Sequence, residues 1–93
     1  MDYNAIMKNL ENLLKALAND KRLAIIRTLK SKKELSVGEI ADEIDLSFRS
    51  TSHHLKTLLN AGVLENQRRM NIIEYRIADS VPRVLTKIFP FIL

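Results

Sequence analysis

Polar and cationic side chains gather between residues 47 and 60, the segment of this sequence best suited to chemistry. At a helical advance of about 100° per residue, Thr51, Leu55 and Leu58 fall on one side of a helix. The opposite side carries Arg49, Ser52, His53 and Lys56. These groups suit base edges and phosphates in a DNA major groove. Taken alone, such a stripe is more often an ordinary solvated helix face. The elements around it favour a helix that packs with one face and reads DNA with the other.

A short helix and a tight turn precede this segment. Ser36 and Glu39 have the spacing of a capping box, and apolar residues recur at helical spacing after Ser36. Ser47 is placed to cap the next helix, which Gly62 can end in the left-handed conformation. Residues 36–60 are therefore expected to form a helix-turn-helix.

The apolar pattern changes to a period of two at Val63, which predicts a β-hairpin, or wing, over residues 63–78. We expect its tip at residues 66–71. That tip has no glycine, so Asn66 or Asn71 is expected to supply a positive φ.

Two adjacent arginines, Arg68 and Arg69, lie in the tip of this hairpin. A hairpin beside a reading helix can reach the neighbouring minor groove, whose narrow width attracts arginine. We favour this interpretation over the alternative of a solvated turn that carries two charges.

Amphipathic helices are expected at both ends of the chain, over residues 3–18 and 80–92, with another helix that begins after Asn19 or Asp20. The signals for the last helix are a cap at Asp79 or Ser80, Pro82 in the first turn, and a bend or end at Pro90. The first and last helices carry more apolar surface than a small core can bury, which predicts a homodimer. The residues of that predicted interface are Ile6, Leu10, Leu13, Val81, Leu85, Phe89 and Ile92.

Composition excludes several classes of function. Without cysteine the chain has no disulfide, thiolate metal site or thiol nucleophile. His53 and His54 diverge by about 100° on a helix and cannot chelate one ion within a single chain. We interpret the acidic residues from Glu39 to Asp45 as solubility and helix-dipole groups. There is no glycine-rich phosphate loop and no nucleophile elbow. We therefore expect no catalytic residue, no metal and no cofactor.

Charge and hydropathy indicate the partners and the location. The net charge of +4 and the pI near 9.6 favour a polyanionic partner. The first residues lack the basic start and apolar block of a signal peptide, and no apolar run approaches the ~20 residues that span a bilayer. We expect a cytoplasmic protein without a membrane partner.

The chain resembles the ArsR family of small winged helix-turn-helix repressors over nearly its whole length. The matching stretches are LKALANDKRLAIIRTL (14–29), ELSVGEIADEIDLS (34–47), STSHHLKTLLNAGVL (50–64) and EYRI (74–77). This resemblance implies a homodimeric repressor that dimerises through its first and last helices and binds an imperfect palindrome in double-stranded DNA.

The resemblance also assigns roles to residues of the helix-turn-helix and the wing. The residues that it places in or beside the groove are Arg49, Ser52 and His53, with Ser47, Ser50 and Lys56 in support and Arg68 and Arg69 on the wing. Ser36 matches a position that contacts phosphate, which agrees with anion binding at a helix N-terminus. Phe48 occupies a position that is often polar, where it either contacts a thymine methyl or packs inward against Leu59.

The departures from the family pattern concern metal sensing and the wing. Metal-sensing members have cysteines where this chain has Ser36 and Gly38, or Asp and His on the last helix, where only Asp79 remains. The resemblance therefore implies a branch that responds to another ligand, to a partner protein, or to nothing, and the effector is unknown. Met70 also replaces a glycine that is usual in the wing.

Together these patterns predict one mainly α domain over residues 1–93, with the order helix, helix, helix-turn-helix, hairpin, helix. The leading hypothesis is a sequence-specific DNA-binding regulator that represses by occluding a promoter. The alternative is a winged-helix module that binds a partner protein and has no specific DNA site.

Overall fold

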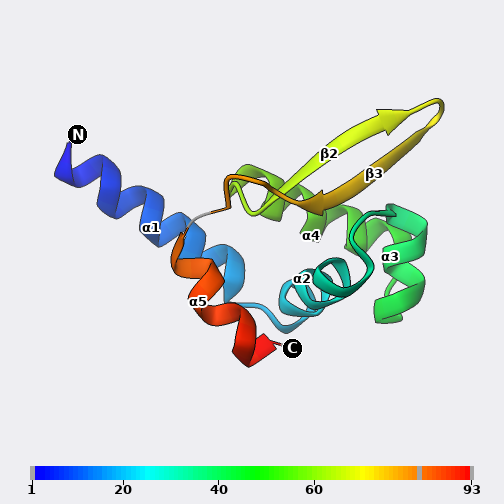
Figure 1. The fold of residues 1–93 in the computed structure, drawn as a ribbon, viewed down its shortest axis with the longest axis horizontal. Coiled ribbons are helices and arrows are strands. Elements are labelled where there is room, and N and C mark those ends of the chain that lie inside the picture. Colours follow the sequence, from blue (N-terminus) through cyan, green and yellow to red (C-terminus); the bar gives the residue numbers. More distant parts are fainter. Residues whose placement is uncertain (1, 82, 93) are drawn as a thin grey trace.

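The computed structural model describes residues 2–81 and 83–92, apart from the side chain of Ile92, and its elements follow the predicted order (Figure 1). The helices are α1 (Tyr3–Leu17), α2 (Asp20–Lys32), α3 (Val37–Ile44), α4 (Phe48–Asn60) and α5 (Arg83–Ile92). The strands are β1 (Leu35–Ser36), β2 (Leu64–Arg69) and β3 (Ile72–Ile77). The predicted winged helix-turn-helix fold is confirmed.

Side-chain caps begin three of the helices at the predicted residues. The Asn19 side chain accepts hydrogen bonds from the backbone N–H groups of Lys21 and Arg22, at 2.9 and 3.1 Å, and begins α2. Ser36 and Glu39 form the predicted capping box of α3, and Ser47 accepts from a backbone N–H in the first turn of α4. Because these caps satisfy N–H groups that have no partner inside the helix, they fix where each helix starts.

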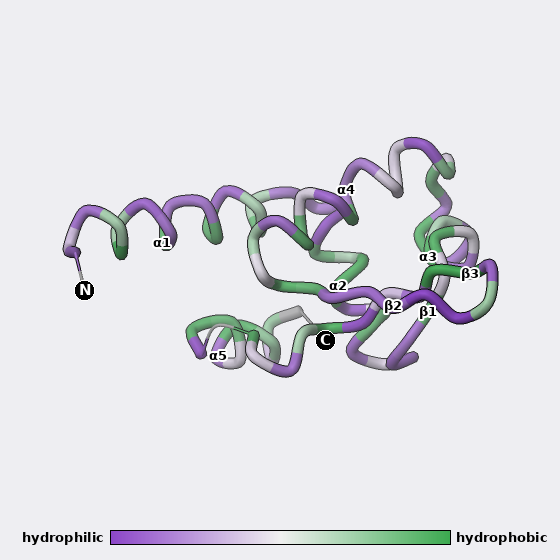
Figure 2. The backbone as a smooth tube through the Cα atoms, turned by 90° about the horizontal axis from the view of Figure 1, so that it is seen from above, coloured by the Kyte–Doolittle hydropathy of each residue, from purple (hydrophilic) through white to green (hydrophobic). Residues whose placement is uncertain are grey.

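The core lies where α2, α3, α4 and α5 meet the base of the hairpin. Its largest fully buried side chains are Ile25, Ile26, Leu29, Ile40, Leu55, Leu58, Leu85, Val63 and Thr51. The N-terminal part of α1 extends away from this body, and α5 is largely hydrophobic along its length (Figure 2). Of the helices that the structure describes, none combines the length and apolar character needed to cross a membrane.

The wing is part of a three-stranded antiparallel sheet in the order β1, β3, β2. The prediction did not include β1, because a two-residue strand is too short to show a period. The predicted tip at residues 66–71 was wrong: β2 continues to Arg69, which pairs with Ile72, so the loop is Met70 and Asn71 alone. The positive φ belongs to Met70, at 56°, and not to Asn66 or Asn71.

The positive φ angle of Met70 indicates that a substitution at this position can stabilise the fold. Left-handed backbone costs a residue other than glycine about 1–2 kcal/mol, whereas glycine loses about 0.5–1 kcal/mol of extra chain entropy on folding. Met70 is 93% exposed, so its side chain contributes little packing. We expect Met70→Gly to raise the free energy of unfolding by up to about 1 kcal/mol in urea denaturation. Met70→Ala, which keeps the backbone penalty, should bring no such gain; an equal gain in both variants would contradict this explanation.

The start of the last helix also differs from the prediction. Neither Asp79 nor Ser80 caps it, because residues 78–81 form a turn and α5 begins at Arg83. The carboxylate of Asp79 instead accepts a hydrogen bond from Arg76 at 3.3 Å. Pro82, predicted for the first turn, lies outside the described residues. Pro90 does not end the helix, which continues to its last described residue.

Candidate nucleic-acid interface

The two faces of α4 have the predicted difference in burial. Thr51, Leu55 and Leu58 are fully buried against the rest of the fold. On the other face Arg49, His53 and Lys56 are exposed, and Ser52 is half-buried. Because the apolar face is fixed in the core, the rotation of α4 about its axis is also fixed. The cationic face therefore points outward without any partner from the described part of the chain in an ion pair.

The N-terminal end of α4 adds exposed polar groups to this face. Ser47 and Ser50 are both exposed, and the Ser47 hydroxyl accepts a hydrogen bond from the Ser50 N–H at 3.1 Å. Phe48 is 63% exposed, so it does not pack inward against Leu59. Ser36 is half-buried at the start of α3, where its hydroxyl accepts from the Glu39 N–H.

The two arginines near the tip of the wing are not equivalent. Adjacent residues of a strand point to opposite faces of the sheet. Arg69 forms ion pairs with Glu34 at 3.3 Å and with Glu74 at 3.1 Å. Arg68 is exposed and has no ion pair with any described residue. The hairpin therefore presents Arg68 as its available cation, and Arg69 ties the hairpin to the loop before β1.

Several cations of α2 have structural partners. The Lys30 ammonium lies 5.1 Å from the centre of the Phe89 ring, and Lys32 forms an ion pair with Glu43 at 3.0 Å. The Arg22 guanidinium faces inward and contacts His54. These contacts leave α4 and the wing as the better candidates for DNA contacts.

His54 is half-buried, as predicted, but its partner was not predicted. Its Nδ1 atom lies 3.1 Å from the Nη1 atom of Arg22, a residue that is distant in the sequence. Burial is the main reason why the pKa of His54 is lowered, and the positive charge of Arg22 adds to this effect. No local pattern could have indicated this pair, because the two residues are on different helices.

The lowered pKa of His54 predicts that stability depends on pH. The folded chain resists protonation of the ring, whereas the unfolded chain takes up a proton near the ordinary pKa of 6.5. The contribution of the neutral His54 ring to the free energy of unfolding is therefore complete above about pH 6.5. Below that pH the free energy of unfolding declines, by less than the one-proton limit of about 1.4 kcal/mol per pH unit. Urea denaturation from about pH 7.5 to about pH 5.5 measures this decline.

Two matched variants test the origin of that pH dependence. His54→Asn is expected to lose most of the decline in stability between about pH 6.5 and pH 5.5, whereas His53→Asn is expected to keep it. Equal declines in the wild type and in His54→Asn would show that another group causes the effect.

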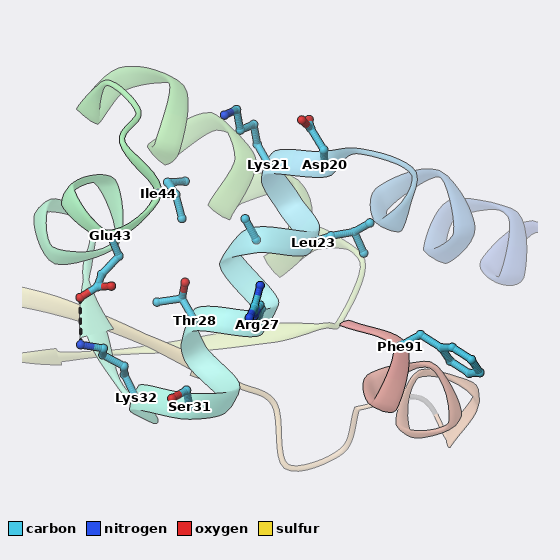
Figure 3. Close-up of a pocket in the computed structure, with 11 residues that line it drawn as sticks. Asp20, Lys21, Leu23, Arg27, Thr28, Ser31, Lys32, Glu43, Ile44 and Phe91 are labelled. Atoms are coloured by element: carbon cyan, nitrogen blue, oxygen red, sulfur yellow. Dashed lines mark ion pairs between the residues drawn. The ribbon is translucent and has the colours of Figure 1, made fainter. Parts of the chain in front are cut away.

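A hollow of about 690 Å³ lies over α2, between α3 and the end of α5 (Figure 3). Its lining includes Lys21 and Arg27 but also Asp20, and the ion pair between Lys32 and Glu43 closes one side. Because both signs of charge are present, the hollow lacks the uniform positive potential of a phosphate-binding surface. Among the described residues, no three His, Asp or Glu side chains are grouped so that they could hold a metal ion.

The predicted dimer residues divide into two groups. Leu13 and Leu85, which were predicted for the interface, are 5% and 0% exposed within the single chain, where they belong to the core. Ile6 and Leu10 are each 39% exposed, while Val81 and Phe89 are half-buried; the Ile92 side chain lies outside the described residues. The exposed apolar face of α1 also includes Met7 and Leu14, which were not in the predicted set.

Comparisons with known proteins agree with this geometry. A family model of a helix-turn-helix domain matches residues 17–67. The homodimeric winged helix-turn-helix DNA-binding domain of Mb0332 from Mycobacterium bovis, a possible ArsR-family transcriptional regulator, superposes with a TM-score of 0.81 at 28% identity, and the match covers 96% of this chain and 79% of that one. The transcriptional activator HlyU of Vibrio cholerae is 32% identical over 76 residues, which are 82% of this chain and 69% of HlyU. The chain belongs to the ArsR family.

Other relatives are matched over a smaller part of their length. The HTH-type transcriptional regulator YceK of Bacillus subtilis is 44% identical over 57 residues, which cover 60% of this chain and 57% of YceK. The chain thus spans less than two thirds of the length of some relatives that it matches. The ArsR-family assignment confirms the resemblance stated from the sequence, and the matched residues 17–67 include both helices of the helix-turn-helix.

Proposed function

We propose that this ArsR-family protein is a homodimer that binds a palindromic site in double-stranded DNA and represses transcription by covering a promoter. The observation that carries the proposal is the orientation of α4. Three fully buried residues hold one face of that helix in the core, and the opposite face exposes cations and hydroxyls. Such a helix fits the width and hydrogen-bonding groups of the major groove.

In this proposal each polar side chain on the reading face of α4 and at its N-terminal end has a role in DNA binding. Arg49, near the N-terminus of α4, supplies a forked donor for a guanine edge, and His53 and Ser52 extend the same stripe. Lys56, Ser47 and Ser50 contact the phosphates, as does Ser36 at the start of α3. Phe48 is exposed beside Arg49, so it is placed to contact a thymine methyl.

On the wing, Arg68 is the proposed minor-groove or phosphate contact. Arg69 contributes less than Arg68, because it must give up Glu34 and Glu74 before it binds a phosphate. The wing therefore adds affinity mainly through one cation at each end of the dimer.

The exposed apolar residues of α1 support the proposed dimer. Ile6, Met7, Leu10 and Leu14 form one face, and only the last part of α1 packs on its own chain. In the proposed dimer, α1 and α5 of one copy pack against the same helices of the second copy across a two-fold axis and bury this face. The reading helices of the two copies then enter successive major grooves about 34 Å apart. The homodimeric state of Mb0332 is consistent with this arrangement.

Selection of binding sites from random DNA duplexes tests the proposal. We expect a palindrome to be enriched, with binding that weakens steeply as salt rises, at a slope of about 0.9 per phosphate contact in a plot of log K against log salt. A winged-helix module that binds a partner protein would enrich no sequence, and its binding would change little with salt. Recovery of unrelated sequences would therefore favour that alternative.

A further inference from the structure

One guanidinium group, that of Arg22, connects three helices. Its Nε atom donates to the Ala16 carbonyl at 2.6 Å, and its Nη2 atom donates to the Lys15 carbonyl at 3.3 Å. Its Nη1 atom lies 3.1 Å from Nδ1 of His54. Arg22 itself is in the first turn of α2, the two carbonyls are at the end of α1, and His54 is in the middle of α4.

The chemistry of the two side chains fixes the direction of these hydrogen bonds. An arginine in a protein stays protonated and only donates, so Nδ1 of His54 accepts and the ring is neutral. Burial and the charge of Arg22 lower the pKa of His54, which keeps the ring in this acceptor state near neutral pH. Carbonyls at the end of a helix lack partners within the helix, and a cation is favoured there.

We propose that Arg22 is a positioning residue for DNA recognition, which sets the angle between α1 and α4. In the proposed function, α1 carries the dimer surface and α4 carries the reading face, with His53 next to His54. A fixed angle between these helices fixes how far apart the two reading helices lie in a dimer. The inference rests on the proposed function, because half-site spacing has meaning only for a dimer on DNA.

The forked shape of the guanidinium is essential to this role. A lysine keeps the charge but is a compact group on a flexible stem, so it cannot hold three acceptors in a fixed plane. Each added base pair moves the half-sites apart by about 3.4 Å and rotates one relative to the other by about 34–36°, since a turn has 10–10.5 base pairs. The spacing preference is therefore a sensitive measure of the angle between α1 and α4.

The test measures affinity for three kinds of duplex: the palindrome selected by the wild type, the same palindrome with one base pair added to or removed from the spacer, and a single half-site. We expect the wild type to bind the altered spacers at least about tenfold more weakly. Arg22→Lys should lose this preference, to less than about threefold, while its affinity for the half-site stays within about twofold of the wild type. Arg27→Lys, the same change at an exposed position of α2, should behave as the wild type.

Variants of His54 provide a second test that does not depend on the folding of Arg22→Lys. In His54→Asn the Oδ1 atom takes the place of Nδ1 as an acceptor, so the spacing preference should be kept; in His54→Leu it should be lost. Equal weakening of all duplexes by Arg22→Lys, or the same spacing preference in both His54 variants, would overturn the positioning role. A wild type that selects no palindrome would instead overturn the proposed function.

Discussion

Leu10→Glu is expected to turn the dimer into a monomer and to weaken binding to the palindrome by about 10²- to 10⁴-fold, the usual gain from linking two binding modules. Leu10 lies in the middle of the exposed apolar face of α1 and is 39% exposed in the single chain. A glutamate there would place two carboxylates in the apolar interface, one from each subunit, and their desolvation is costly. Sedimentation would measure the oligomeric state, and fluorescence anisotropy with a labelled duplex would measure the affinity.

The control for this substitution is Lys8→Gln, which changes the net charge by the same amount. Lys8 is two residues from Leu10 and so about 200° away on α1, and its ion pair with Glu11 is exposed and weak. We expect Lys8→Gln to remain dimeric and to bind the palindrome as the wild type does. If Leu10→Glu stays dimeric, the proposed interface is wrong. If Leu10→Glu is a monomer that keeps full affinity for the palindrome, the proposal that DNA binding requires a dimer is wrong.

Arg49→Ala is expected to reduce affinity for the selected site by about 1–3 kcal/mol, or roughly 5- to 150-fold, and to relax the preference at one base position. Arg49 is exposed near the start of α4 and has no ion pair among the described residues. Its loss therefore removes a base contact without breaking a contact within the fold. Binding measured on the selected duplex and on its single-base variants separates the change in affinity from the change in preference.

Arg68→Ala provides a contrast with the same type of side chain. It should weaken binding more evenly across sequences and lower the salt slope by about one contact per subunit, because a wing arginine contributes mainly through charge. Arg27→Ala, at an exposed position of α2, should change neither quantity. Unchanged affinity and unchanged base preference in Arg49→Ala would show that the reading face is assigned to the wrong side of α4.

The residues that the family resemblance gives to metal-sensing sites are replaced in this chain, apart from Asp79. The expected cysteine positions hold Ser36 and Gly38, and Ser36 serves as the cap of α3 through its hydroxyl. The hydroxyl thus has a structural role at the place where a thiolate would bind metal.

The sequence alone predicted those features that depend on residues close together in the chain. The caps at Asn19, Ser36 and Ser47 follow from interactions within about one helical turn, which residue type and spacing specify. The helical period of the apolar residues indicates which side of α4 can be buried. The apolar surface of the first and last helices also predicted a homodimer, and the family resemblance added a palindromic DNA site as an expectation, because it compares patterns over the whole chain.

Only the tertiary structure decided how distant residues combine. The pair of Arg22 and His54 is separated by 32 positions, and Arg69 reaches Glu34 across the sheet, so neither contact has a local signal. Burial of Leu13 and Leu85 depends on how α1 and α5 pack on the rest of the chain, although their sequence pattern is the same as that of residues left exposed. Helical period places a side chain on a face, but what covers that face is set by the packing of whole elements against one another.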